Sequence, residues 1–276
     1  MAVARERRLA FGDVAELYDR ARPSYPAALV DDVLEFARAR AGDLALEVGA
    51  GTGKATALFA QRGLKILALE PSSEMAVVAR RNCAGYENVA IDQTDFERWR
   101  AGRDAYRLLF SAQAWHWVTP EARYVRAREA LIAGGALAVF WNRPRWESCP
   151  FREELEEAYR DAAPDFGPGA GPGPMHPATQ ASPEPWGDWE GELRAAPGFG
   201  EPDVRVYERG HRYETDEYLR LLQTHSDHIL LPPEQRDALL DAVAGVIDRH
   251  GGSLELEYVT LLCLARATGG AKRAPG

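Results

Sequence analysis

Cysteine is scarce in this sequence, and no long apolar run is present. The 276 residues include three cysteines, Cys83, Cys149 and Cys263, and no two of them form a CxxC pair. Neither a zinc knuckle nor a disulfide framework is therefore predicted, and this usage is typical of a reducing compartment. No apolar stretch approaches the ~20 residues that a membrane helix needs, and residues 1–10 lack the apolar segment of a signal peptide. We therefore expect a soluble cytoplasmic protein with no membrane partner.

An excess of positive charge is also missing. The chain has 33 Lys and Arg residues against 42 Asp and Glu residues, which gives a formal net charge of -9 at pH 7. Such a balance argues against a broad basic face, so we expect no nucleic-acid partner. Hydrophobic residues make up 46% and charged residues 27%, the composition of an ordinary globular protein. The length favours one large domain with an insertion, or one and a half domains.

Short apolar runs alternate with helical stretches through the first half of the chain. This alternation predicts βαβ units and therefore an α/β fold with a parallel sheet. The expected strands are 44–48, 65–69, 88–91, 106–110, 136–141, 203–209 and 254–265. The expected helices are 13–21, 26–40, 54–61, 72–83, 120–132, 151–163, 215–223 and 233–250, with Pro26 as the first residue of its helix.

The composition changes between residues 164 and 202. This window holds 9 of the 18 prolines and 8 of the 25 glycines, and its segment 167–174 cannot form a regular element. The window is either a mobile loop or an ordered lid. We therefore predict three parts: a core with an N-terminal lid over residues 1–145, a helical cap or insertion over 146–225, and a C-terminal helix and strand over 226–276 that complete the core.

A glycine-rich turn is the strongest chemical signal. The first expected strand runs directly into Gly49-x-Gly51-x-Gly53 and then into a helix. Glycines let a backbone turn sharply and approach a ligand closely, and a helix N-terminus offers N–H groups. The pattern is neither a dinucleotide fingerprint, whose third glycine would fall at Lys54, nor a P-loop. Glu47, two residues before the first glycine, can face a positively charged ammonium group instead.

Further polar and aromatic residues follow the later strands, at the edge where open α/β sheets bind ligands. Glu70 ends the second strand about 20 residues after the glycine turn, a position suited to ribose hydroxyls. Asp95 and Phe96 follow the third strand, where an acid and an aromatic ring can clamp an adenine. The segment 111–117, Ser-Ala-Gln-Ala-Trp-His-Trp, follows the fourth strand. These features together indicate a nucleoside-containing ligand.

Taken together, these motifs resemble those of class I S-adenosylmethionine-dependent methyltransferases, in their bacterial small-molecule branch. The similarity covers roughly residues 11–145 motif by motif, and the final helix and strand by pattern. It is carried by Glu47–Gly53, Glu70–Pro71, Asp95–Phe96, Ser111–Trp117, Ala133–Leu137 and the opening segment Phe11–Tyr25. Residues 146–202 show no such similarity.

The resemblance implies a Rossmann-like fold whose seven-stranded sheet is mostly parallel, with an antiparallel last strand. It implies S-adenosylmethionine as cofactor, S-adenosylhomocysteine as product, and in-line displacement at the sulfonium methyl of the cofactor. The glycines would line the methionine moiety, and backbone carbonyls at the end of the fourth strand would meet its ammonium group. The implied cofactor-binding residues are Tyr18, Glu47, Gly49, Ala50, Gly51, Gly53, Glu70, Pro71, Asp95, Phe96, Ser111 and Ala112.

His116 is the candidate catalytic residue. It is either a general base or a hydrogen-bonding partner of the substrate, and the alternative is a packed histidine that orients the two indoles beside it. The candidate substrate-binding residues are Tyr25, Trp115, Trp117, Asn142 and Arg143. The two tryptophans equally fit a pocket wall or the core. A small-molecule methyl acceptor is the expected partner.

Several residues outside these motifs invite weaker hypotheses. Arg22 can meet an anionic group, and a structural role is the alternative. His225 and His228 would share a helical face if one helix continues through them, but a pocket wall is favoured over a metal site, so no metal is predicted. The expected cap is rich in aromatic residues, which favours a substrate with an apolar body; these are Trp146, Phe166, Trp186 and Trp189.

Two other functions fit the same sequence. One is a methyltransferase-fold enzyme that uses S-adenosylmethionine for cyclisation or rearrangement, because a fold does not determine a reaction. The other is a non-catalytic module that binds the cofactor. The acceptor, the methylated atom and the oligomeric state stay open at this point.

Overall fold

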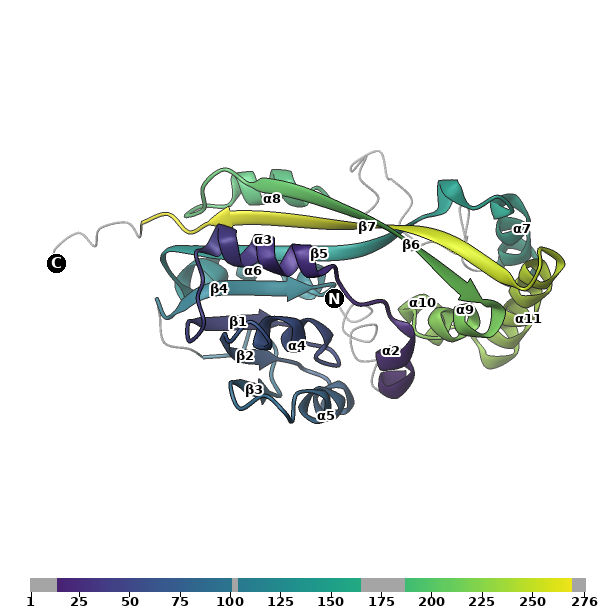
Figure 1. Ribbon diagram of the computed structural model, residues 1–276. Coiled ribbons are helices and arrows are strands. Elements are labelled where there is room, and N and C mark those ends of the chain that lie inside the picture. Colours follow the sequence, from purple (N-terminus) through teal and green to yellow (C-terminus); the bar gives the residue numbers. More distant parts are fainter. Residues whose placement is uncertain (1–13, 101–103, 165–186, 270–276) are drawn as a thin grey trace. The chain divides into compact units, whose positions relative to one another are not determined.

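The computed structural model describes residues 14–100, 104–164 and 187–269 (Figure 1). The chain divides into two compact units. The sheet unit takes its described residues from Ser24–Trp141, Trp189–Tyr207 and Leu261–Gly276. The helical unit takes its described residues from Met1–Pro23, Asn142–Asp188 and Glu208–Thr260. Each unit is thus assembled from segments that lie far apart in the sequence.

One sheet of seven strands is present, with the order β3-β2-β1-β4-β5-β7-β6. Its strands are β1 (Leu44–Val48), β2 (Lys65–Leu69), β3 (Val89–Asp92), β4 (Tyr106–Ala112), β5 (Leu131–Arg145), β6 (Asp203–Glu214) and β7 (Ser253–Arg266). The pairs β1–β2, β1–β4, β2–β3 and β4–β5 are parallel, whereas β7 runs antiparallel to β6. The mostly parallel, seven-stranded sheet with an antiparallel last strand is therefore confirmed.

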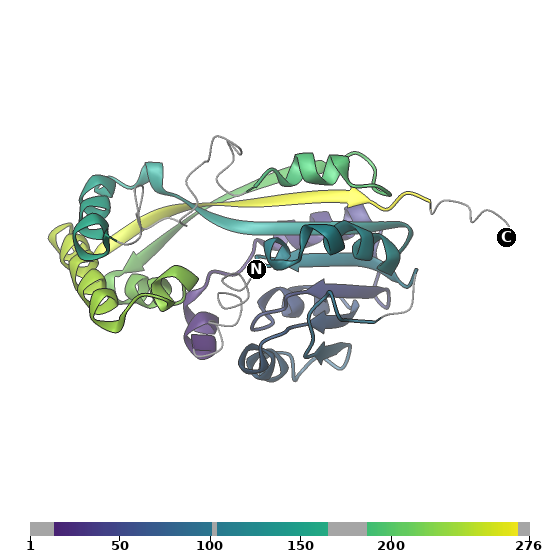
Figure 2. The same ribbon diagram turned by 180° about the vertical axis from the view of Figure 1, so that it is seen from behind.

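Helices cover both faces of the sheet unit, which explains why the strands at its centre, β1, β4 and β5, are mostly buried. Figure 1 shows α3 (Ala27–Ala37) and α4 (Lys54–Ala60) on the near face, and Figure 2 shows α6 (Pro120–Ala130) on the opposite face. Successive strand residues alternate between the two faces: Phe110 packs toward α3 and α4, and Leu109 packs toward α6. Helices α5 (Ser73–Asn82) and α8 (Trp189–Ala195) also belong to this unit.

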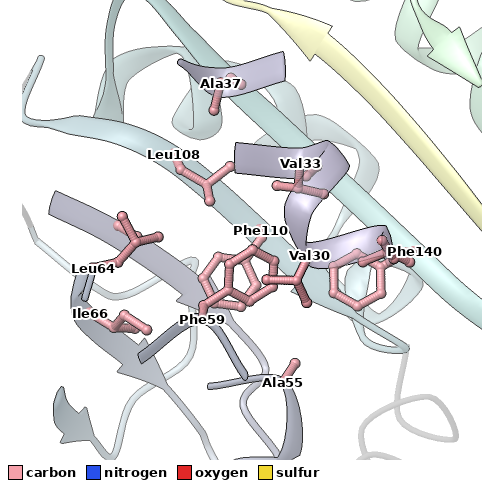
Figure 3. Packing of buried hydrophobic residues seen from close by; sticks show 14 of the residues in the cluster. Val30, Val33, Ala37, Ala55, Phe59, Leu64, Ile66, Leu108, Phe110 and Phe140 are labelled. Atoms are coloured by element: carbon pink, nitrogen blue, oxygen red, sulfur yellow. The ribbon is translucent and has the colours of Figure 1, made fainter. Parts of the chain in front are cut away.

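Three phenylalanines form the centre of the layer between the sheet and its first helices (Figure 3). The ring centroids of Phe59 and Phe110 lie 4.2 Å apart, and those of Phe59 and Phe140 lie 6.4 Å apart. Val30 and Val33 of α3 pack in the same cluster. All five side chains are fully buried, so this cluster holds β4, β5 and both helices together.

The helical unit has a hydrophobic core of its own. Its helices are α2 (Ala15–Ala21), α7 (Arg152–Ala162), α9 (Thr215–Leu222), α10 (Ser226–Ile229) and α11 (Pro233–Arg249). Leu155 and Tyr159 of α7, Leu222 of α9 and Val243 of α11 are fully buried in one cluster. None of the helices in the described ranges has the length and apolarity needed to cross a membrane.

Most of the predicted elements are confirmed, and β1 and β2 have the expected bounds. Several details were wrong. Helices α8 and α10 were not predicted, β4, β5 and β6 extend beyond their expected ends, and Pro26 precedes α3 as its N-cap rather than opening it. No single helix passes through His225 and His228, because α9 ends at Leu222 and His225 is the N-cap of α10. The predicted boundaries at residues 145 and 225 stay a prediction.

We expect Phe110→Ala to lower the free energy of unfolding by about 3–5 kcal/mol, because it leaves a buried cavity beside the ring of Phe59. Urea denaturation followed by fluorescence measures this loss. Val125→Ala, at a side chain on α6 that is 53% exposed, is the matched control and should stay within about 0.5 kcal/mol of the parent. Equal losses in the two variants would contradict this description of the core.

Candidate functional site

The glycine turn joins β1 to α4. Gly49, Gly51 and Gly53 all have positive φ, at 74°, 57° and 84°, a region that residues with a side chain rarely adopt. The N–H groups of Gly49 and Ala50 donate to the carbonyl of Leu69 at 2.9 and 3.0 Å, which ties the turn to the end of β2. The turn is therefore a fixed structure, held by the neighbouring strand.

Each glycine of the turn is needed for a different reason. A Cβ at Gly49 would lie 2.3 Å from the Cβ of Ala114, and a Cβ at Gly53 would lie 3.1 Å from Sγ of Cys83. A Cβ at Gly51 would meet nothing within 4 Å. Gly49 and Gly53 thus permit close packing, whereas Gly51 faces open space in which a ligand can approach the backbone.

Glu70 links the glycine turn to the end of β2. Its Oε2 accepts a hydrogen bond from the Gly51 N–H, and its Oε1 accepts one from the Ser72 N–H, both at 2.8 Å. The side chain is only 7% exposed. A carboxylate oxygen is a hydrogen-bond acceptor and has more than one lone-pair position. Glu70 therefore shapes the turn and also presents acceptor oxygens beside it. Pro71, the next residue, is half-buried.

Glu47 is completely buried beneath the turn. Its Oε2 accepts a hydrogen bond from Oγ1 of Thr56 at 2.5 Å, and its Oε1 has no hydrogen-bond partner among the described residues. Burial raises the pKa of this carboxyl to about 8; Thr56 opposes the shift and the charge of Glu70 adds to it. A buried acceptor without a donor is costly, so this oxygen fits a ligand that brings a donor or a positive charge.

The end of β4 lies against the same turn. The hydroxyl of Ser111 donates to the carbonyl of Val48 at 2.7 Å, and the N–H of Gln113 donates to the carbonyl of Phe140 at 2.9 Å. Together with the close approach of Ala114 to Gly49, these contacts bring Ser111 and Ala112 beside the glycine turn. Four of the predicted groups, Glu47, the glycines, Glu70 and Ser111, thus meet in one place.

Asp95 and Phe96 are used differently from one another. Asp95 accepts a hydrogen bond from the Arg98 N–H at 2.8 Å and pairs with the Arg98 side chain at 3.3 Å. The ring of Phe96 is 2% exposed and lies between the rings of Trp99 and Trp115, at centroid distances of 6.1 and 6.0 Å. The Phe96 ring is therefore part of the core, and an adenine contact by these two residues stays a prediction.

The segment after β4 presents His116 to solvent. The two tryptophans beside it differ, because Trp115 is fully buried against Phe96 and Tyr124 whereas Trp117 is half-buried. The His116 ring lies 4.6 Å from the ring of Trp117. Nδ1 of His116 accepts a hydrogen bond of 3.4 Å from the indole N–H of Trp141. His116 and Trp117 therefore remain candidates for ligand contact, while Trp115 fills the core.

Tyr25 packs edge-on against Phe140, at a centroid distance of 4.9 Å, in the sheet unit. Its hydroxyl-bearing ring is half-buried. A role in substrate binding stays a prediction for this residue.

Other predicted ligand-binding residues belong to the helical unit. Arg22 donates to Oγ1 and to the carbonyl of Thr224, at 2.8 and 2.9 Å, and lies over the ring of Tyr18 at 5.1 Å. Asn142 accepts from Thr260 at 2.7 Å and donates to the Pro23 carbonyl at 3.3 Å. These bonds give Arg22 and Asn142 structural roles.

Arg143, Trp146 and Trp189 are all buried. Arg143 is 8% exposed in the helical unit, and Trp146 packs edge-on against Tyr218 at 6.1 Å. Trp189 stacks on Trp141 in the sheet unit. The remaining aromatic residues of the predicted cap, at positions 166 and 186, lie outside the described residues.

His225, Asp227 and His228 gather side-chain atoms that could hold a metal ion. Both ring nitrogens of His228 already have partners, Oδ1 of Asp227 and the hydroxyl of Tyr159, each at 2.8 Å. Although burial opposes ionisation of Asp227, its hydrogen bond and charge contact with His228 lower the pKa of the carboxyl. Burial and the charge of Arg22 lower the pKa of His225. The side chains of Asp227 and His228 are thus engaged in hydrogen bonds, and the positive charge of nearby Arg22 opposes a cation.

Sequence reasoning missed several residues that support the site. Thr56 is the partner of Glu47, Ala114 fits against Gly49, and Trp141 is the partner of His116. Thr56 lies on α4 three residues after Gly53, so its position one turn into the helix was a readable signal. Nothing in the sequence pattern pairs Trp141 with His116, because the two lie 25 residues apart.

Comparisons with known proteins agree on one family. Residues 45–135 match the family model described as a methyltransferase domain. An uncharacterized methyltransferase of Mycobacterium bovis is 37% identical over 161 residues, which are 58% of this chain and 63% of that relative's length. An uncharacterized methyltransferase-like protein of Schizosaccharomyces pombe is 27% identical over 90% of this chain and 91% of its own.

A solved structure shows the same fold. It is that of a proposed type II methyltransferase from Anaeromyxobacter dehalogenans, with a TM-score of 0.61 and 19% sequence identity. The similarity covers 90% of this chain and 98% of that one.

We expect Gly49→Ala to destabilise the protein more than Gly51→Ala. The first substitution combines a positive φ with a severe overlap, which together cost at least about 2 kcal/mol, whereas the second carries only the backbone cost of about 1–2 kcal/mol. Urea denaturation of both variants measures the difference. A larger loss of unfolding free energy in Gly51→Ala than in Gly49→Ala would contradict the finding that the space beside Gly51 is open.

We expect Glu47 to make the protein less stable as the pH rises. The pKa of this carboxyl is about 8 when folded and 4.5 as a model value. The folded state keeps a proton that the unfolded state releases, so stability is full below pH 4.5 and falls as the pH rises toward 8. The slope is at most ~1.4 kcal/mol per pH unit.

Glu47→Gln is the control, since the amide cannot titrate in this range. Its free energy of unfolding should fall less than that of the parent between pH 5 and pH 8. Parallel pH profiles for the two proteins would exclude this role of Glu47.

Proposed function

Because residues 45–135 are a methyltransferase domain and the chain has the class I S-adenosylmethionine-dependent methyltransferase fold, we propose that it transfers a methyl group from S-adenosylmethionine to a small molecule. We propose that it does so as a soluble protein of the cytoplasm. One observation carries the proposal most directly: the turn from β1 to α4 is open at Gly51 and is flanked by the acceptors of Glu70 and Glu47.

The residues around the turn fit this cofactor. Its amino group would supply the donor and the positive charge that the unpartnered Oε1 of Glu47 lacks. Its ribose hydroxyls would donate to the carboxylate of Glu70, which lies beside the turn. The backbone at Gly51 would accept a close approach, because even a Cβ finds no neighbour there. When bound, the cofactor supplies an electrophilic methyl group on a sulfonium centre.

The protein contributes to the reaction chiefly by holding the cofactor and aligning it with the methyl acceptor. Gly49, Gly51 and Gly53 shape the turn, Glu70 orients the Gly51 N–H, and Ser111 holds the end of β4 to the end of β1. Alignment of two reactants is worth up to ~7–11 kcal/mol of the barrier, so no further catalytic group is required when the acceptor atom carries no proton. For an acceptor that does carry one, a general base adds ~10²–10⁴-fold.

The net charge and two aromatic residues support a small molecule as the methyl acceptor. The net charge of -9 argues against nucleic acid, and half-buried Tyr25 and Trp117 in the sheet unit offer aromatic surface for a small molecule. Asn142 and Arg143 remain candidate substrate residues of the helical unit. The methylated atom is left open by these residues.

We expect calorimetric titration to show binding of S-adenosylmethionine and S-adenosylhomocysteine, and no binding of NAD. Gly51→Arg should abolish both affinities, because its side chain would occupy the open space at the turn. Circular dichroism establishes whether the variant is folded. Retained affinity in a folded Gly51→Arg protein would mean that the site is elsewhere, and binding of NAD alone would point to a dehydrogenase-type site.

The product then identifies the reaction. Methyl transfer to a member of an acceptor panel yields S-adenosylhomocysteine and an acceptor that is heavier by one methyl group in mass spectrometry. Methylthioadenosine would instead indicate cyclisation of the cofactor. Binding without consumption would indicate a rearrangement of another substrate or a non-catalytic module.

A further inference from the structure

The hydrogen bond between Trp141 and His116 determines which nitrogen of the imidazole carries the proton. An indole nitrogen can only donate, so Nδ1 of His116 must be the acceptor in the 3.4 Å contact with Nε1 of Trp141. A neutral imidazole has one N–H, which must then lie on Nε2. His116 therefore has its lone pair directed at Trp141 and its donor on the other nitrogen.

The indole of Trp141 is itself held from two helices. It stacks on Trp189 of α8, with ring centroids 4.7 Å apart and planes inclined by 17°. Trp189 in turn lies under the guanidinium of Arg123 of α6, at 5.0 Å. Trp141 is 4% exposed, so its orientation is set by packing.

Arg123 is fixed by hydrogen bonds at both ends of its guanidinium. It donates to the carbonyl of Val118 through Nη2 at 2.7 Å and through Nε at 3.3 Å. Its Nη1 pairs with Glu192 of α8 at 2.7 Å. The order of support thus runs from Arg123 through Trp189 to Trp141 and ends at His116, with all four residues in the sheet unit.

We propose that Trp141 is a positioning residue that keeps His116 as an Nε2–H donor. The ligand group that this donor recognises is an atom with a lone pair, an oxygen or nitrogen of the methyl acceptor. This inference rests on the proposed function for the identity of the ligand, but the state of the imidazole does not depend on it.

The consequence concerns the role of His116 in the reaction. Nε2 carries a proton, so it cannot remove one from the methyl acceptor. Nδ1 could act as a base only if its hydrogen bond from Trp141 were broken. His116 therefore binds and orients the acceptor by donating a hydrogen bond, and no proton moves through it. Between the two functional hypotheses drawn from the sequence, this geometry favours hydrogen bonding to the substrate over general base catalysis.

Nitrogen-15 NMR of the full-length protein, labelled in its six histidines, tests the state of the imidazole. His116→Gln identifies the resonances of His116 by their loss, and long-range proton–nitrogen spectra above the titration range report which nitrogen is protonated. We expect the Nε2–H form in the parent. Trp141→Phe keeps an aromatic ring to stack on Trp189 but has no N–H, so the ratio of Nε2–H to Nδ1–H should fall by about three- to ten-fold.

Trp99→Phe is the matched control, because Trp99 lies in the same unit and packs against Phe96 and Tyr106 rather than against His116. It should leave the His116 spectrum unchanged. An Nδ1–H form in the parent, or an unchanged ratio in Trp141→Phe, overturns the proposal. Calorimetry with S-adenosylhomocysteine on Trp141→Phe should show the affinity of the parent, which separates this test from that of the cofactor site.

Three variants of His116 test the donor role with any acceptor that the mass-spectrometric panel identifies. The amide of Gln can donate from near the position of Nε2, whereas Asn cannot reach it and Ala has no donor. We expect kcat/KM for that acceptor to fall about three- to ten-fold less in His116→Gln than in His116→Ala, with His116→Asn close to Ala. Equal, large losses of kcat in all three variants would instead identify His116 as a base, and no losses would identify it as a packing residue.

Discussion

The hydrogen bond from the Gly51 N–H to Glu70 is the interaction on which the site depends. It connects the end of β2 to the turn that follows β1, and thereby fixes a backbone that only glycine can follow. Two acids, Glu47 and Glu70, lie close enough to repel one another. Glu70 accepts hydrogen bonds from two backbone N–H groups, which stabilise its anion. Glu47 holds a proton because it is buried. A cationic ligand beside Glu47 would favour the loss of that proton.

The strands and the turn could be predicted because their causes are local. β1 and β2 are five-residue apolar runs bounded by turn residues, and the glycine spacing requires a sharp turn whatever surrounds it. Helix α8 could not be predicted, because the prolines and glycines around it outweigh the helical spacing of its apolar residues Trp189 and Leu193. The extra length of β5 was hidden by Gly134, Gly135 and Pro144, which usually end a strand, but pairing in the sheet overrides that preference.

The site was predictable in its backbone and less so in its side chains. Phe96 and Trp115 have the same apolar character in a pocket wall as in a core, and only the packing shows that their rings lie inside. The position of Asn142 near the end of β5 suggested ligand binding, which stays a prediction, but did not show that its amide bonds to Thr260, which is 118 residues away. Hydrogen-bond partners of this kind come from separate elements, so no local pattern could pair Thr56 with Glu47 or Trp141 with His116.

The bond between Arg22 and Thr224 has a consequence for how the protein is made. Its two residues are 202 positions apart, so α2 leaves the ribosome well before its partner does. At typical rates of synthesis the interval is about 10–40 s, far longer than a helix needs to form and unfold again. During that time the helical unit is incomplete, whereas the strands β1 to β4 and their helices are contiguous in the chain and can associate early. A chaperone that binds α2 during synthesis would therefore meet this helix before Thr224 has been made.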